Sequence, residues 1–316
     1  MNGRIGGLAR LVVILGPTAS GKSALGISLA ERLDGEILVC DSTQVYRHFD
    51  IGTGKVSPAE QRGIPHHLVD LVDPEEVFSA GEYRRRALEV LDDVRRRGKL
   101  PIITAGTGLY LRALLEGLAD APERSEELRE RLRRKAQKHG LLHLHRVLVR
   151  MDREAAARIA PRDTQKIIRA IEIRKLAGKA VGEVHRGGRS ALAGFEIRKI
   201  GLQPTRDALY ARINARVESM IAAGWPDEVR GLIARGVPAD AKPFQFIGYS
   251  DLYTGLVRTP APGSRAIAEA IPLIQQATRR FSKRQITWFR KELEVHWLPG
   301  FGDDAQVLAP ALAIAT

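Results

Sequence analysis

Residues 16–23, Gly-Pro-Thr-Ala-Ser-Gly-Lys-Ser, have the spacing of a phosphate-binding loop: a glycine, four spacer residues, then Gly-Lys-Ser. Glycines let consecutive backbone N–H groups surround phosphate oxygens, and the helix that follows adds the positive end of its dipole. Lys22 adds a mobile charge, and the Ser23 hydroxyl is a typical ligand of phosphate-bound Mg²⁺. A kinase, an ATPase and an enzyme that expels pyrophosphate could all carry this loop.

Two further polar residues follow apolar runs of the chain. Asp41 comes directly after residues 36–40, and Thr107 follows residues 100–106. Because the carboxyl ends of parallel strands meet at one edge of a sheet, we expect both side chains to face the phosphate site. Nucleotide hydrolases usually place an acidic residue after a later strand, but the run at 100–106 ends without one. Asp41 is therefore a candidate for other chemistry, and its alternative role is to cap the next segment.

These residues depend on elements that the apolar pattern predicts. Short β-branched runs indicate buried strands, and longer segments with apolar residues on one face indicate helices. Ser79 is a suitable N-cap for the second helix, and Gly98 is a suitable stop. The predicted strands cover 11–15, 36–40, 100–106 and 195–203, and the predicted helices cover 22–33, 79–97, 207–224 and a segment that begins at Gly108. The alternation of strands and helices predicts an α/β fold with a parallel sheet flanked by helices.

The segment 121–190 differs from the rest of the chain. It contains 19 Lys and Arg but 9 Asp and Glu, and so carries +10 of the net charge of +13. Its pattern is helical with little strand character. We therefore predict a basic helical insertion domain at 121–190, within a core built from 1–120 and 191–316. Such a basic block suits a polyanion such as nucleic acid, and the alternative is a solvated helical face, as at 127–140.

Cysteine content and apolar runs indicate the compartment. Cys40 is the single cysteine, which excludes an intramolecular disulfide and fits a reducing compartment. The apolar run 11–15 is too short for a signal peptide or a membrane span. We therefore expect a cytoplasmic protein without a membrane partner.

Six stretches, in this order, carry a resemblance to a known family. They are GPTASGKS, DSTQVYRHFDIGTGK, GIPHHLVDLVDP, TAGTGLYLRALLEGL, FIGYSDL and TRRFSKRQITWFR. Together they closely resemble the bacterial tRNA dimethylallyltransferases, also called tRNA isopentenyltransferases, of the IPP transferase family. The resemblance extends from about Leu11 to Trp297 and implies a core sheet like that of P-loop NTPases.

The resemblance also implies a reaction. Such an enzyme transfers a dimethylallyl group from dimethylallyl diphosphate to N6 of adenine 37 in tRNAs that read codons beginning with U. The products are N6-(dimethylallyl)adenosine and diphosphate. Mg²⁺ is the implied cofactor, tRNA is the implied partner, and the enzyme is expected to be a monomer. The loop at 16–23 would then hold the diphosphate of the prenyl donor.

The resemblance assigns roles to residues at matching positions. Asp41 is the base that accepts a proton from N6, Thr107 is a second polar group at the reacting centre, and Arg212 binds the diphosphate. Arg216 lies one helical turn further and could serve instead of Arg212. The donor-binding residues are Gly16, Pro17, Thr18, Ala19, Ser20, Gly21, Lys22 and Ser23, of which Ser23 also holds the metal. The tRNA-contacting residues are Asp41, Ser42, Thr43, Gln44, Thr107, Arg129, Gln165, Lys166, Ile167, Ile168, Arg169, Gln245, Phe246, Ile247, Gly248, Tyr249 and Ser250.

Elementary chemistry agrees with these roles. Negative charge grows on the leaving diphosphate, where Lys22 and the loop amides can stabilise it. The exocyclic amine is a poor nucleophile because its lone pair is delocalised, and a carboxylate that bonds N6–H would localise that pair. An adenine in a stacked anticodon arm must leave the stack to reach a recessed donor.

Several alternatives remain open on the sequence. An adenylate isopentenyltransferase would use the same donor, although a free nucleotide needs no basic domain. A P-loop kinase of a small metabolite would use ATP. A non-catalytic RNA-binding module would need neither Asp41 nor Thr107. His66 and His67 suggest zinc, but no cysteine pair is near in the sequence, and we expect them to brace the loop near the donor.

Overall fold

The computed structural model describes residues 8–186, 190–258 and 264–316. Residues 1–7, 187–189 and 259–263, which belong to the predicted core and insertion segments, lie outside the described residues. By internal contacts the chain divides into a core unit, formed by Met1–Leu114 and Ala193–Thr316, and an insertion unit, Leu115–Leu192.

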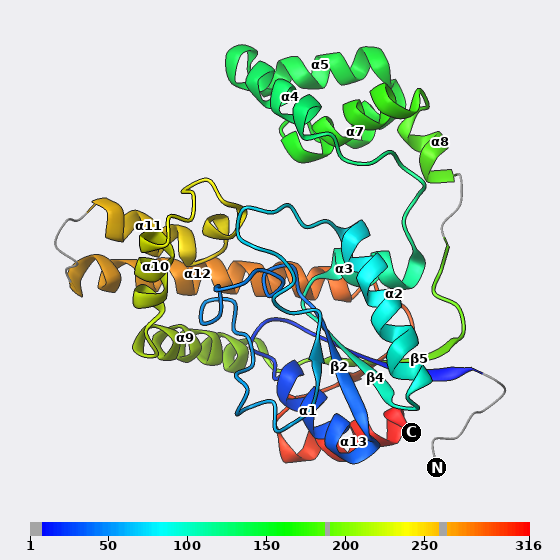
Figure 1. Cartoon of the computed structure of the whole chain (residues 1–316), viewed down its shortest axis with the longest axis vertical. Helices are drawn as coiled ribbons and strands as arrows, with labels where there is room; N and C mark the ends of the chain where they lie inside the picture. Colours follow the sequence, from blue (N-terminus) through cyan, green and yellow to red (C-terminus); the bar gives the residue numbers. More distant parts are fainter. Residues whose placement is uncertain (1–7, 187–189, 259–263) are drawn as a thin grey trace. The chain divides into compact units, whose positions relative to one another are not determined.

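The core unit contains one parallel sheet in the order β3-β2-β4-β1-β5-β6. Its strands β2, β4 and β5 are labelled in Figure 1. The strands are β1 (Ala9–Leu15), β2 (Gly35–Cys40), β3 (His66–His67), β4 (Leu100–Ala105), β5 (Phe195–Leu202) and β6 (Val295–Leu298). The prediction of a parallel sheet is therefore confirmed. Cys40 of β2 pairs in register with Ala105 of β4. The two strands consequently end side by side, which brings the segments after them together.

Burial on both faces explains why the strands are almost continuously apolar. On one face, alternate residues such as Val12, Ile37 and Ile102 pack against α1 (Lys22–Leu33) and α13 (Ala305–Ala315). The residues between them, such as Val13 and Ile103, are equally buried. The helix α2 (Ala80–Arg96) contacts β2 and β4. As predicted, Ser79 caps α2, and its side chain accepts a hydrogen bond from the Glu82 N–H.

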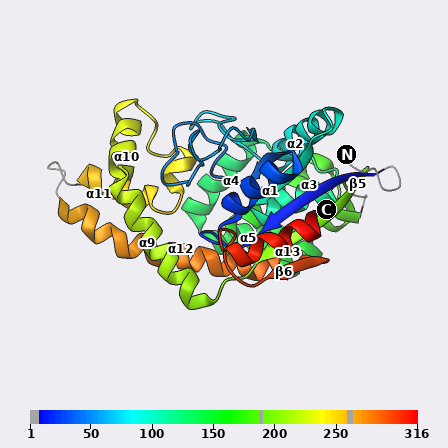
Figure 2. The same cartoon turned by 90° about the horizontal axis from the view of Figure 1, so that it is seen from below.

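The second half of the core unit adds a group of helices beside the sheet. They are α9 (Arg206–Ala222), α10 (Trp225–Ala234), the short 3₁₀ helix η1 (Lys242–Gln245), α11 (Tyr249–Arg258) and α12 (Ser264–Phe289). The helices α10 and α11 gather at one end of the unit, and α12 runs back from there (Figure 2). Ala19 of the phosphate loop packs against Leu209 and Ile213 of α9. This contact places one face of α9 next to the loop.

The insertion unit has its own hydrophobic core. Its helices are α4 (Glu126–His139), α5 (Leu141–Met151), α6 (Arg153–Arg158), α7 (Thr164–Ala177) and α8 (Val181–Arg186), and α3 (Gly108–Glu116) leads into it. Leu132 of α4, Leu148 of α5 and Ile167 of α7 belong to one buried cluster. Ser125 caps α4, and Asp152 caps α6. In this part of the chain the described secondary structure is helical.

Candidate active site

The phosphate loop lies between β1 and α1, as the sequence predicts. Gly21 has φ 86°, and Ala19, a non-glycine residue, has φ 62°. These left-handed conformations turn the chain sharply into α1. The Lys22 ammonium reaches back over the loop and donates to the carbonyl oxygens of Gly16 (3.0 Å) and Pro17 (2.8 Å). The buried Ser20 hydroxyl has no hydrogen-bond partner among the described residues.

Asp41 and Thr107 meet at the edge that the strand register predicts. The N–H groups of Gly106 and Thr107 both donate to the Cys40 carbonyl oxygen at 3.0 Å. The Thr107 hydroxyl accepts from the Ser42 N–H at 2.9 Å and lies 3.2 Å from the Ser42 hydroxyl. These bonds join the segment after β2 to the segment after β4.

The two carboxylate oxygens of Asp41 have different surroundings. Oδ1 accepts from the Thr43 N–H (2.9 Å) and hydroxyl (2.7 Å), which makes a local turn. Oδ2 lies against Gly106, so close that an added Cβ there would sit 2.4 Å from it. None of the described residues donates a hydrogen bond to Oδ2. One oxygen therefore fixes the side chain, and the other remains able to accept a hydrogen bond.

Lys22, Asp41 and Arg216 act on one another electrostatically. Desolvation of the Lys22 ammonium lowers its pKa to about 8, the charge of Asp41 opposes this shift, and Arg216 adds to it. The Arg216 guanidinium lies against Gly54, where an added Cβ would meet Nη2 at 2.1 Å. These three charged side chains thus belong to one site.

Arg212 is engaged elsewhere. Its guanidinium makes two 2.7 Å hydrogen bonds to the Asp303 carboxylate and lies 4.6 Å from the ring centroid of Phe301. This pairing lowers the pKa of the Asp303 carboxyl below its usual value. Of the two arginines that the sequence leaves as alternatives, Arg216 is the one whose charge acts on Lys22.

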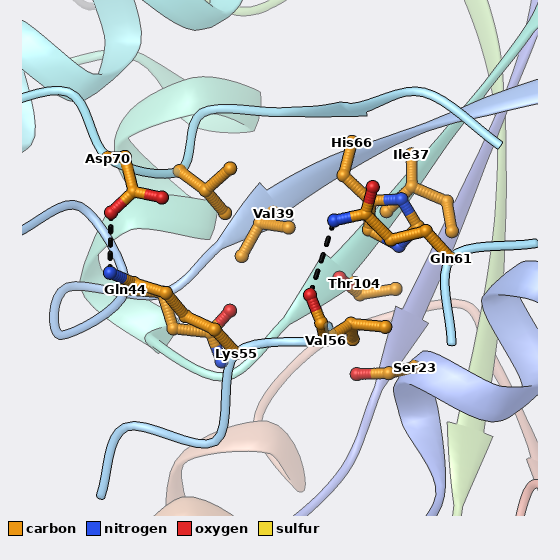
Figure 3. Close-up of a pocket in the computed structure, with 11 residues that line it drawn as sticks. Ser23, Ile37, Val39, Gln44, Lys55, Val56, Gln61, His66, Asp70 and Thr104 are labelled. Atoms are coloured by element: carbon orange, nitrogen blue, oxygen red, sulfur yellow. Dashed lines mark hydrogen bonds and ion pairs between the residues drawn. The ribbon is translucent and has the colours of Figure 1, made fainter. Parts of the chain in front are cut away.

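A small cavity of about 40 Å³ lies beside Ser23, at the start of α1 (Figure 3). Gln44, Gln61, His66 and Thr104 also line it. The volume is that of one or two water molecules. Apolar side chains line it as well, so the surroundings of Ser23 are of mixed polarity: Ile37, Val39, Val56 and Val69.

Ion pairs and aromatic packing hold the segment that follows Asp41. The Lys55 ammonium donates to the Tyr46 carbonyl oxygen and to the carboxylates of Asp50 and Asp70 at 2.5–2.6 Å. The Glu228 carboxylate accepts from the N–H groups of Asp50 and Ile51. A fixed segment keeps Asp41 and its neighbours in place without a helix or strand of their own.

The predicted tRNA stretch 245–250 lies against the same segment. The Tyr249 hydroxyl donates to Glu228 at 2.6 Å and accepts from the Gly52 N–H at 3.1 Å. The Trp225 indole fits between Gly52 and Gly248, because an added Cβ at either glycine would lie within 2.2 Å of the ring. Tyr249 and Gly248 are buried, whereas Gln245 and Ser250 are exposed and available to a ligand.

The paired histidines contact different partners. His66 Nδ1 lies 2.8 Å from the Ile64 carbonyl oxygen, and His67 Nε2 lies 2.7 Å from the Glu36 carboxylate. Arg97 also bonds Glu36, and these bonds lower the pKa of that carboxyl to about 2 despite its burial. In the described parts of the chain, no three His, Cys, Asp or Glu side chains cluster as metal ligands would.

In the insertion unit, two of the predicted tRNA residues form an internal ion-pair cluster. Arg129 bonds the fully buried Glu172 carboxylate through two contacts of 2.8 Å. Arg169 bonds the same carboxylate at 2.5 Å and the Pro122 carbonyl oxygen at 3.0 Å. Burial raises the pKa of Glu172, but the two arginines and the Ser125 N–H outweigh it and lower the pKa to about 2.

The other predicted residues of α7 divide by exposure. Ile167 and Ile168 are buried in the core of the insertion unit. Gln165 is exposed, and so is Lys166, whose side chain is 72% exposed. Lys166 is therefore the cation of this stretch that is most open to a ligand.

The loop and the parallel sheet define the core unit as a P-loop-type fold, and comparisons with known proteins narrow the class. The sequence profile of the IPP transferase family matches residues 44–292. A tRNA dimethylallyltransferase of Koribacter versatilis is 51% identical over 308 residues, which cover 96% of this chain and 97% of that protein. One of Solibacter usitatus is 46% identical over 303 residues, or 96% of each chain.

Two solved structures support the same family. The tRNA isopentenylpyrophosphate transferase of Bacillus halodurans superimposes with a TM-score of 0.68 at 37% identity, covering 97% of this chain and 94% of that chain. A eukaryotic dimethylallyltransferase acting on tRNA superimposes with a TM-score of 0.75 at 25% identity, covering 92% and 73% respectively. This chain belongs to the IPP transferase family, as the sequence resemblance predicts.

One residue of the site was not singled out from the sequence. Gln285 of α12 bonds both the phosphate loop and the segment before Thr107. It belongs to the stretch TRRFSKRQITWFR, which carries the family resemblance. The signal in the sequence that could have found it is a neutral amide among the five basic residues of this stretch.

Proposed function

We propose that this protein transfers a dimethylallyl group from dimethylallyl diphosphate to N6 of adenine 37 in tRNAs that read codons beginning with U. The observation that carries the proposal is the convergence of Lys22, Asp41 and Thr107 at one edge of the sheet. The proposal also draws on the relatives, which are named tRNA dimethylallyltransferases.

The proposed reaction breaks the C1–O bond of the donor and forms a bond between C1 and N6. Diphosphate leaves with the bonding electrons, and Lys22 and the loop N–H groups stabilise its developing charge. Asp41 Oδ2 accepts a hydrogen bond from N6–H and then the proton, so N6 ends neutral. Thr107 positions the segment next to Asp41 through its bonds to Ser42.

Arg216 is the residue that we propose for diphosphate binding, in preference to Arg212. The Arg216 charge already acts on Lys22, which also binds the diphosphate in this proposal. Arg212 is already paired to the Asp303 carboxylate, which offsets part of its charge before a phosphate arrives.

Mg²⁺ fits this site as a metal that arrives with the diphosphate. Ser23 offers one hydroxyl oxygen at the start of α1, and Mg²⁺ usually combines one or two protein oxygens with phosphate oxygens and water. When bound, the ion would neutralise charge on the phosphates.

We propose that tRNA contacts both units separately. On the core unit, the candidate residues are Asp41 to Gln44 and the exposed side chains of 245–250. On the insertion unit, Lys166 and the exposed basic residues of α4 suit the phosphates of an anticodon stem. Arg129 and Arg169 can contribute there while they stay paired to Glu172, because a salt-bridged guanidinium keeps further N–H donors.

We further propose a cytoplasmic monomer, since tRNA is the acceptor and the single cysteine suits a reducing compartment. In the described residues no helix has the length and apolar character required to span a bilayer. Sedimentation at several protein concentrations checks the oligomeric state.

A transfer assay tests the acceptor. Purified protein, Mg²⁺ and radiolabelled dimethylallyl diphosphate are mixed in parallel with a tRNA that contains A36 and A37, or with AMP. We expect label in the tRNA alone. Label in AMP would instead identify a nucleotide-modifying enzyme, and phosphate release from added ATP without prenyl transfer would indicate a kinase or ATPase.

A further inference from the structure

Gln285 connects the two halves of the candidate active site through one side-chain amide. Its Oε1 accepts from the Thr18 N–H at 2.7 Å, and its Nε2 donates to the Gly106 carbonyl oxygen at 2.8 Å. The backbone groups dictate the orientation of the amide, since an N–H can only donate and a carbonyl can only accept. Gln285 is 6% exposed, so water competes little for either bond.

The two bonded residues belong to different functional segments. Thr18 lies in the loop that holds the diphosphate in the proposed function. Gly106 contacts Asp41 Oδ2 and precedes Thr107. One glutamine side chain therefore bridges the loop that holds the leaving group and the segment beside the proton acceptor, in addition to the pairing of β1 with β4.

We infer that Gln285 is a positioning residue that sets the register between the diphosphate loop and Asp41. This inference rests on the proposed function. Transfer requires the donor C1 to lie between the departing oxygen and the attacking N6, and a displacement of about 1 Å in such an arrangement can lower a rate by about 10²-fold. Each binding segment remains complete without Gln285, so the inference predicts a loss of rate with little loss of binding.

The test compares Gln285→Met with Gln275→Met. Methionine has a similar length but cannot make either hydrogen bond. Gln275 lies on the same helix, α12, and donates to the Asn214 carbonyl oxygen and to Glu218, both on α9, with no hydrogen bond to the loop. The two substitutions thus remove comparable amide hydrogen bonds from one helix, and Gln275→Met controls for general destabilisation.

Single-turnover transfer to tRNA, binding of inorganic pyrophosphate, binding of tRNA and the Tm are measured for both variants. We expect Gln285→Met to transfer about 10–100-fold more slowly, with both affinities within about threefold of wild type. Gln275→Met should transfer at the wild-type rate, although its Tm should be similar to that of Gln285→Met. Gln285→Glu, which retains the acceptor but not the donor amide, should also be slowed.

Three results would overturn the inference. One is a Gln285→Met protein that transfers at the wild-type rate. The second is an equal loss of rate in Gln275→Met. The third is a rate loss in Gln285→Met that weaker pyrophosphate and tRNA binding explain. A wild-type protein that transfers no prenyl group at all would instead refute the proposed function, so the two failures are distinguishable.

Discussion

At the scale of single residues, the site depends on which polar atoms are engaged within the protein and which are free. Asp41 uses Oδ1 for its own turn and presents Oδ2 beside Gly106. The sequence places Asp41 after a strand but leaves its alternative role as a cap open. Only the geometry distinguishes the two oxygens, because the role of each depends on contacts with residues far along the chain.

Asp41→Asn should lower the single-turnover transfer rate by about 10²–10⁴-fold. Asparagine keeps an oxygen for the two Thr43 bonds but cannot accept the N6 proton. We expect the tRNA affinity, measured by filter binding, to stay within a few-fold of wild type. The control is Asp73→Asn, which removes an exposed carboxylate paired to Arg47 in the same unit. A parallel loss of tRNA affinity in Asp41→Asn would contradict the assignment of the base.

Arg216→Met should raise the KM for dimethylallyl diphosphate by at least about tenfold, because hydrogen bonds to charged groups contribute about 1.5–3 kcal/mol. Arg212→Met removes the same charge from the same helix but from a side chain already paired to Asp303. We therefore expect a smaller change in KM. The opposite order of effects in steady-state kinetics would return the diphosphate role to Arg212.

At the scale of secondary structure, local signals predict most of the sheet and its first helices. The observed β2, β4 and β5 each lie within one residue of the predicted ends. The cap at Ser79 is also confirmed, because a serine side chain bonds a nearby N–H that is defined by the local sequence. The short β3 and β6 were missed. Their few residues carry no alternating pattern, and they join the sheet through pairing with distant strands.

Two arginines on the helices of the insertion unit have a structural role that the sequence alone did not reveal. Arg129 and Arg169 read as surface cations in a basic segment, yet both bond the buried Glu172. A buried carboxylate requires such partners. The burial of Glu172 on α7 depends on how the helices pack and cannot be seen in the sequence alone. The predicted contacts of these arginines with tRNA stay a prediction.

Arg129→Met should destabilise the insertion unit by about 3–5 kcal/mol, since it leaves a buried carboxylate with one fewer partner. The pKa of Glu172 is about 2 in the folded protein, against 4.5 for a free glutamate. A lowered folded pKa means that the pair stabilises the fold above pH 4.5 and that this contribution disappears as the pH falls toward 2. Hydrogen exchange of the α4 and α7 amides reports local unfolding. Measured in the wild type and in Arg129→Met between about pH 3 and 7, it tests both effects. Protection that is unchanged in Arg129→Met would contradict this structural role.

At the scale of the whole molecule, charge and contacts divide the chain at similar places. The net charge of +10 in residues 121–190 falls within the insertion unit, Leu115–Leu192. A contiguous segment with its own core can present a basic surface without perturbing the sheet. Composition could indicate a polyanionic partner for this surface, but tRNA came from the family resemblance.

The affinity for tRNA should fall steeply with salt, and part of that dependence should come from α4. Arg131→Gln with Arg134→Gln removes two exposed cations of this helix. We expect the slope of log K against log salt to become shallower by about 1 for each phosphate that the protein no longer neutralises. The control, Arg95→Gln with Arg96→Gln, removes two cations near the start of β4, at the opposite edge of the sheet from Asp41. Equal slopes for all three proteins would show that α4 does not bind the phosphates.

If one site both breaks a prenyl diphosphate and alkylates adenine 37, the two products must form together, and their stoichiometry is the decisive measurement. The protein is incubated with Mg²⁺, dimethylallyl diphosphate, ATP and an anticodon stem-loop that carries either A37 or G37. Pyrophosphate and N6-(dimethylallyl)adenosine are then measured in the same sample. We predict equal amounts of both products with A37, neither above background with G37, and intact ATP. Cleaved ATP without prenylated adenosine, or a prenyl group on any base other than A37, would contradict the proposed function.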